Sequence, residues 1–208
     1  MEQVGGGTRT KNRNRQSVMN KIATHDSATG ERGLDFLSWL VTPFARTQSK
    51  TIKEQYESGC RMFDIRVVLE DDLVWRCAHG IWVSKREAYD ILKEINDFEE
   101  QCYVALTYEG DAGLEYPFSL FVNKCKSNLT HIKWGGIGIK YGKDANLLSV
   151  KYDYIEPYPK DWPPTRRKFL PLDGTTWHII LPIPWLWKKI YYDKVEFDDE
   201  AYTFVDFL

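Results

Sequence analysis

Two histidines and an acid–arginine pair are the residues of this sequence whose types and spacing could do chemistry. His25 lies in the run THDS and His79 in the run AHG. Between them, Asp64 and Arg66 lie two residues apart in an apolar segment. Imidazole gains and loses a proton near neutral pH, so two histidines beside opposite charges can serve acid–base chemistry. Either histidine alone would more often be an ordinary surface or core residue.

The segment 61–69, RMFDIRVVL, is predicted to be a strand. Side chains alternate between the faces of a strand, so Met62, Asp64 and Arg66 share one face. A strand this apolar is expected to be buried on both sides, and an acid and an arginine on one buried face need a reason. A simple ion pair is one explanation. A charged site at the carboxyl end of a barrel strand, where α/β barrels carry their active sites, is the other.

Strands and helices are predicted to alternate through residue 130. A capping box beginning at Ser84 predicts a helix whose apolar positions continue to Phe98. Pro117 suits the start of a second helix, and a third is expected over about 48–58, ending before Gly59. The predicted strands in this part are 61–69, 73–78 and 103–108. This alternation is typical of parallel α/β sheets and barrels.

The pattern is less regular after residue 130. Four runs are predicted to be strands, KWGGIGIKYG, NLLSVKYDYI, TTWHIIL and YTFVDFL, and the segments between them are rich in proline and tryptophan. No clear amphipathic helix is found there. A (β/α)8 barrel usually needs about 250 residues, and this chain has 208. We therefore expect an α/β chain with a small barrel that is distorted or incomplete in its second half.

Composition and charge indicate which partners and which cellular location to expect. The net charge of −2 gives no global attraction to nucleic acid, so no nucleic-acid partner is expected. No window of about 18 apolar residues predicts a transmembrane helix, and no apolar stretch follows the basic start as in a signal peptide. The four cysteines lack metal-site or disulfide spacing, which favours a cytoplasmic or peripheral membrane location. Residues 1–16 are predicted to be a flexible basic arm, and 17–208 a single domain.

In this order and spacing, the runs THDS, TIKEQYESGCRMFDIR and AHG resemble the X-domain of phosphatidylinositol-specific phospholipases C. The similarity covers about residues 18–110. It implies a TIM-type barrel and a phosphodiesterase in which His25 is the general base and His79 the general acid. Arg66 would stabilise the charge on the phosphoryl oxygens. Asp26 would orient His79, and Asp64 would orient Arg66 or bind the attacking hydroxyl.

Two further acids enter through the same resemblance. Asp206 matches the last-strand aspartate of the family, which pairs with the first histidine. Arg66 stands where the calcium-dependent branch has an acidic residue, and Asp26 where that branch has an asparagine, which favours the metal-independent bacterial branch. Glu109 differs, because bacterial members tend to have lysine there and calcium-dependent members glutamate. The alternative is a calcium ion held by Asp26, Asp64 and Glu109.

The expected substrate is phosphatidylinositol or a related inositol phosphodiester, cleaved without a cofactor. Glu109 and Lys140 are candidates for substrate contacts. Trp185 and Trp187 lie in an aromatic and basic run, PWLWKK, that could touch a membrane, although buried packing explains it as well. Three alternatives stay open: the same chemistry on a soluble phosphodiester, a calcium-dependent phosphodiesterase, and a barrel that binds a ligand without catalysis.

Overall fold

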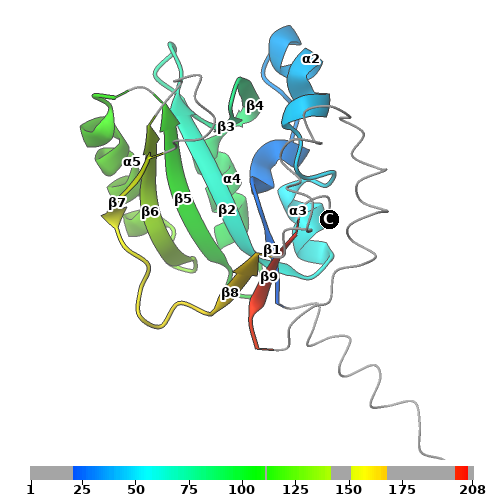
Figure 1. Ribbon diagram of the computed structural model, residues 1–208, viewed down its shortest axis with the longest axis vertical. Coiled ribbons are helices and arrows are strands. Elements are labelled where there is room, and N and C mark those ends of the chain that lie inside the picture. Colours follow the sequence, from blue (N-terminus) through cyan, green and yellow to red (C-terminus); the bar gives the residue numbers. More distant parts are fainter. Residues whose placement is uncertain (1–20, 111, 142–150, 168–199, 206–208) are drawn as a thin grey trace, which may run out of the picture.

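Figure 1 shows the computed structural model of the chain, which describes residues 21–110, 112–141, 151–167 and 200–205. The strands are β1 (Ile22–Thr24), β2 (Cys60–Leu69), β3 (Trp75–His79), β4 (Trp82–Glu87), β5 (Tyr103–Gly110), β6 (Lys133–Tyr141), β7 (Lys151–Glu156), β8 (Thr165–Arg167) and β9 (Tyr202–Val205). The helices are the short 3-10 helix η1 (Ser27–Gly30), α2 (Phe36–Ala45), α3 (Ile52–Glu57), α4 (Ala88–Asn96) and α5 (Glu115–Asn128).

The described strands form one mixed sheet. Its order is β7-β6-β5-β2-β1-β9-β8, with β3 paired to β2 and β4 to β3. Strands β6, β5, β2, β1, β9 and β8 run parallel, whereas β7 is antiparallel to β6. Within the described ranges the sheet is open, since β7 and β8 each pair with a single strand. The mixed α/β class is therefore confirmed, and barrel closure stays a prediction.

Helices cover one face of the sheet. In Figure 1, α4 and α5 lie behind β2, β5 and β6. Apolar side chains from these strands and from α3, α4 and α5 form a continuous buried cluster that includes the residues Ile52, Phe63, Ile65, Ile91, Leu92, Leu106, Phe118, Val122 and Ile137. The polar side chains of the candidate site lie on the opposite face, so the packed helices fix the strands that carry them.

The structure corrects one predicted helix start and shortens the helix expected over about 48–58 to α3, Ile52–Glu57. Ser84 is not a helix cap: it is buried within β4, where its hydroxyl accepts from the Cys77 amide at 3.0 Å and donates to the Arg86 carbonyl at 2.6 Å. Pairing of β4 with β3 outweighs the local capping pattern, and the helix begins at Ala88. The capping box belongs instead to Thr51 at the start of α3.

Candidate active site

Strand β2 separates its side chains as its sequence predicts. Phe63, Ile65 and Val67 belong to the buried apolar cluster beneath the helices. Asp64 and Arg66 lie on the other face, and both are largely buried. Because β2 is paired along both edges, its position is fixed on each side of this acid–arginine pair.

The turn after β1 presents His25 and Asp26 to the same face. Asp26 has φ 44° and ψ 51°, the left-handed region that few residues other than glycine adopt. Side chains hold this turn: the Thr47 hydroxyl and the Gln48 amide donate to the His25 carbonyl at 2.9 and 3.0 Å. The Thr29 hydroxyl donates to the Asp26 carbonyl at 2.9 Å. Unusual backbone geometry held by its surroundings in this way is common at functional sites.

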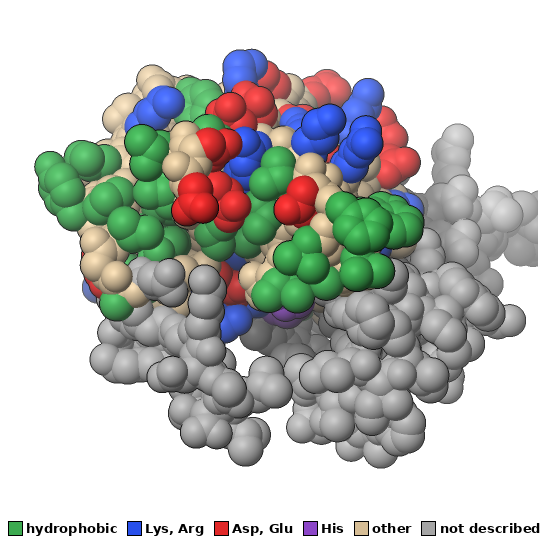
Figure 2. Space-filling view, turned by 90° about the horizontal axis from the view of Figure 1, so that it is seen from above, with side chains coloured by type: hydrophobic (Ala, Val, Ile, Leu, Met, Phe, Trp, Pro, Cys, Tyr) green, Lys and Arg blue, Asp and Glu red, His purple; other side chains and the backbone are tan. Residues whose placement is uncertain are grey.

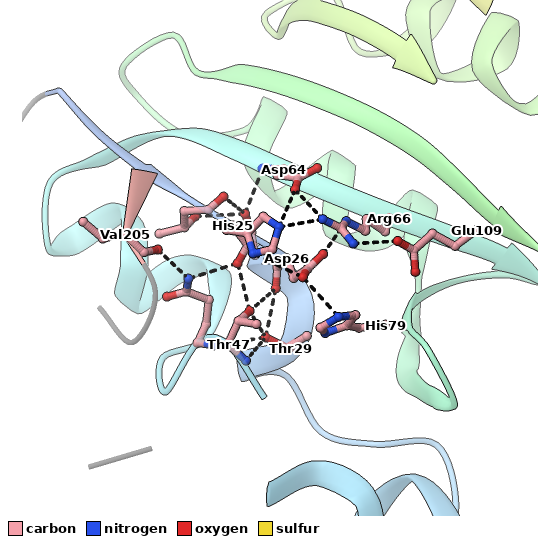
Figure 3. Close-up of polar contacts among 12 residues, drawn as sticks. His25, Asp26, Thr29, Thr47, Asp64, Arg66, His79, Glu109 and Val205 are labelled. Atoms are coloured by element: carbon pink, nitrogen blue, oxygen red, sulfur yellow. Dashed lines mark hydrogen bonds and ion pairs between the residues drawn. The ribbon is translucent and has the colours of Figure 1, made fainter. Parts of the chain in front are cut away.

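His79 reaches the site from an antiparallel branch of the sheet. It is the last residue of β3, and Gly80 follows with φ 60° at the turn into β4. Since β3 runs antiparallel to β2, its end returns toward the turn after β1. There the His79 Nε2 atom lies 3.4 Å from Asp26 Oδ2. Figure 3 marks this contact with a dashed line.

Asp26 joins the two histidines and the arginine. Its Oδ2 atom lies 3.3 Å from Nδ1 of His25 and 3.4 Å from Nε2 of His79, and its Oδ1 atom contacts Nε of Arg66. Its side chain is fully buried. Burial raises the pKa of a carboxyl group, but His25, His79 and Arg66 together outweigh burial and hold the pKa of Asp26 below its ordinary value. Asp26 is therefore a carboxylate at neutral pH.

The Arg66 guanidinium is held on every side (Figure 3). Besides Asp26 at Nε, Glu109 accepts from Nη1 at 2.6 Å and Asp64 from Nη2 at 3.3 Å. Nη2 also lies 2.6 Å from Nε2 of His25. The side chain is 7% exposed. A planar guanidinium fixed in this manner is held in one orientation, with its positive charge at the centre of the site.

Glu109 and Lys140 form the far end of this network. They lie one residue before the ends of the neighbouring parallel strands β5 and β6 and are register partners. The Lys140 ammonium donates to Glu109 Oε1 at 2.8 Å, the same oxygen that accepts from Arg66. Burial opposes ionisation of Glu109, but Arg66 and Lys140 hold its pKa below the ordinary value. The two candidate substrate contacts are thus brought next to Arg66.

The carboxylates of the site raise the question of a bound cation. Among the described residues, ligand atoms of His25, Asp26 and Asp64 lie within 4.8 Å of one another. The Arg66 guanidinium, however, already contacts both of these aspartates and Glu109. Calcium takes six to eight oxygen ligands, and these carboxylates are already engaged by a fixed positive charge. A calcium ion at these carboxylates would therefore have to share them with the Arg66 guanidinium.

Some predicted features lie outside the described residues. These are Asp206, Trp185, Trp187, the strand TTWHIIL and the basic arm 1–16. Strand β9 is described as far as Val205, which pairs with Thr24 at the end of β1. The other predicted site residues, His25, Asp26, Asp64, Arg66, His79, Glu109 and Lys140, come from five separate segments and meet on one face of the sheet.

An exposed apolar surface on helix α2 was not predicted from the sequence. Its members are Phe36, Leu37, Trp39 and Leu40, which are 51–73% exposed, and we call them the α2 patch. Figure 2 shows apolar side chains gathered on the right of the described surface seen from above, with a histidine at their edge. The sequence signal for this helix was the run DFLSWL. Asp35 in this run caps the helix by accepting from the Ser38 amide at 2.7 Å. Sequence alone could not say that the apolar side chains face outward.

Comparison with known proteins agrees with the fold. No protein-family model and no curated protein matches the sequence. Among solved structures, phosphatidylinositol-specific phospholipase C from Listeria monocytogenes superposes with a TM-score of 0.54 at 15% identity, over 91% of this chain and 89% of that chain. A variant of the Staphylococcus aureus enzyme gives 0.49 at 15% identity, over 91% and 86%. The Listeria match shows that the chain is similar in fold to a bacterial phosphatidylinositol-specific phospholipase C over most of its length.

Proposed function

We propose that the chain is a phosphodiesterase that cleaves its substrate by internal attack of a hydroxyl group next to the phosphate. The observation that supports it best is the meeting of His25, His79 and Arg66 around the buried carboxylate of Asp26. Two imidazoles and one guanidinium are the groups needed to remove a proton, return a proton and stabilise the charge on phosphorus.

Hydrogen-bond chemistry supports the base role of His25. A guanidinium can only donate, so the short contact from Arg66 requires a lone pair on Nε2 of His25. The proton of the neutral ring then lies on Nδ1, which faces the Asp26 carboxylate. An imidazole in this tautomer has its basic nitrogen beside Arg66, where the phosphate would bind.

The reaction follows from these positions. When the substrate phosphate replaces His25 as the partner of Arg66 Nη2, the Nε2 lone pair of His25 becomes able to take the proton of the attacking hydroxyl as the hydroxyl oxygen bonds to phosphorus. The bond from phosphorus to the leaving alcohol breaks, and His79 gives a proton to the departing oxygen, so the product is a cyclic phosphodiester. The Asp26 carboxylate, whose Oδ2 lies 3.4 Å from Nε2 of His79, would favour a proton on that nitrogen, so Nδ1–H of the protonated ring would serve the leaving oxygen. Arg66 stabilises the charge on the other phosphoryl oxygens.

Activity is expected without a metal, because Arg66 supplies the positive charge. Turnover of a phosphodiester should be unchanged after dialysis against EDTA. Release of water-soluble product from phosphatidylinositol vesicles, compared with a soluble phosphodiester, is the measurement. Activity that is lost in EDTA and restored by calcium would instead favour the calcium-dependent alternative with Asp26, Asp64 and Glu109.

We propose a lipid substrate, and the α2 patch is the observation that favours it over a soluble one. Contiguous exposed apolar side chains with a tryptophan are typical of surfaces that enter a lipid interface. The chain passes from α2 directly to Thr47, which bonds the backbone of His25 and Asp26. A membrane held by this helix would lie beside the site. In the described part of the chain, no helix is long and apolar enough to cross a membrane.

The double variant Phe36→Asp, Trp39→Asp should bind vesicles at least about tenfold more weakly, because two large apolar side chains are lost from the contact. Sedimentation with phosphatidylinositol–phosphatidylcholine vesicles measures this. The matched control is Ile155→Asp, an exposed apolar position on β7 at the other end of the sheet. Turnover on vesicles should fall by a larger factor than turnover of a soluble phosphodiester. Equal losses for the two substrates would contradict the role of α2.

A further inference from the structure

Glu109 is a charged residue of the site to which the proposed reaction gives no role. Its hydrogen-bond partners include Arg66 at 2.6 Å and Lys140 at 2.8 Å. Its side chain is 8% exposed, and its lowered pKa keeps it charged at neutral pH. Figure 3 shows it beside the guanidinium, on the side away from Asp64. A negative charge placed next to the group that should bind phosphate needs an explanation.

The charged side chains around Arg66 do not by themselves favour the binding of an anion. Asp26, Asp64 and Glu109 all contact the guanidinium, and Lys140 is the second cation of the network among the described residues. Three carboxylates thus face two permanent cations, which leaves one formal negative charge when both histidines are neutral. A protonated His79, as the proposed reaction requires, cancels this excess. The interaction of a fixed charge with a ligand is proportional to the charge of the ligand. If Glu109 weakens binding of a singly charged ligand by some factor, it weakens binding of a doubly charged ligand by about the square of that factor.

We propose that Glu109 determines specificity by ligand charge, so that the site accepts a singly charged phosphodiester and rejects a doubly charged phosphate monoester. The proposal rests on the proposed function only in placing phosphate against Arg66. The same charge selection would help the final product to leave the site. Hydrolysis of a cyclic product to a monoester adds one negative charge, so the final product binds weakly and leaves the site.

The test uses two tetrahedral anions of fixed charge, methanesulfonate (one negative charge) and sulfate (two). Their dissociation constants are measured at pH 8 and constant ionic strength from the imidazole NMR signals of His25 and His79, two of only four histidines in the chain. In the unmodified protein, methanesulfonate should bind more tightly than sulfate. Glu109→Gln should improve sulfate binding about tenfold more than methanesulfonate binding. Tighter sulfate binding by the unmodified protein would overturn the proposal, whether or not the variant folds.

Two controls separate charge from contact. Glu109→Asp keeps the charge, so it should keep the preference of the unmodified protein. Glu100→Gln removes the partner of another β2 arginine, Arg61, from a 2.7 Å ion pair outside the site, and should leave both anions unaffected. An equal gain for both anions in Glu109→Gln would disprove charge selection and leave the phosphodiesterase proposal standing. Histidine signals that respond to neither anion would disprove the phosphate site itself.

Discussion

Changing His25 or His79 to alanine should lower turnover of a phosphodiester by at least about 10²-fold, the usual scale of general acid–base catalysis. One histidine has to act as a neutral imidazole and the other as an imidazolium. The pH–rate profile of the unmodified protein should therefore be bell-shaped, and each variant should lose one limb. His25→Ala should lose the limb on the acid side, where the base becomes protonated. His79→Ala should lose the limb on the alkaline side.

His131→Ala is the matched control, since this histidine follows α5 and its amide bonds to Asn96 outside the site. Its turnover and its two-limbed profile should match those of the unmodified protein. Thermal unfolding of each variant shows whether a loss of activity reflects misfolding. Near-normal turnover in either folded site variant would remove that histidine from the mechanism.

Replacing Arg66 should produce the second large effect. Arg66→Met removes the charge and Arg66→Lys keeps it, but lysine lacks the planar fork that meets Asp26, Asp64 and Glu109 together. Both variants should lose about 10²–10³-fold in turnover, as expected when a preorganised donor to a transition state is removed. Single-turnover kinetics on a soluble phosphodiester measure this loss without a membrane step.

Arg66→Met should also lower the free energy of unfolding by about 3–5 kcal/mol at neutral pH, because it leaves buried carboxylates without their central partner. The pKa values of Asp26 and Glu109 are lowered in the folded protein, so their stabilising contribution is present above the ordinary carboxyl pKa of about 4. That contribution is lost as the pH falls through the lowered values. Urea unfolding at several pH values should therefore show the two proteins converging in acid.

Arg61→Met is the control on the same strand. Arg61 pairs with Glu100, whose side chain is half exposed, at the opposite end of β2. Its replacement should leave turnover unchanged. A pH-independent stability difference for Arg66→Met, or full activity in Arg66→Lys, would contradict the picture of a guanidinium held by three carboxylates.

The strands were predicted well because the alternation of apolar and polar residues that marks a strand lies within the strand itself. The alternation along β2 separated Asp64 and Arg66 from the apolar core, and the THDS and AHG runs placed both histidines at strand ends. The helix start at Ser84 was wrong because strand pairing is a long-range property that a capping pattern does not contain. The outward direction of the α2 patch was missed for the same reason: burial depends on what packs against a helix.

Residue types and spacing were enough to identify His25 and His79 as the candidate acid–base pair, and to place Arg66 on a buried face with Asp64. The folded chain was needed to show that Asp26 lies between both histidines and Arg66, and that Glu109 and Lys140 close the network. These contacts join β1, β2, β3, β5 and β6, segments far apart in the chain. Their geometry depends on sheet register and on the left-handed turn at Asp26, which spacing along the sequence does not specify.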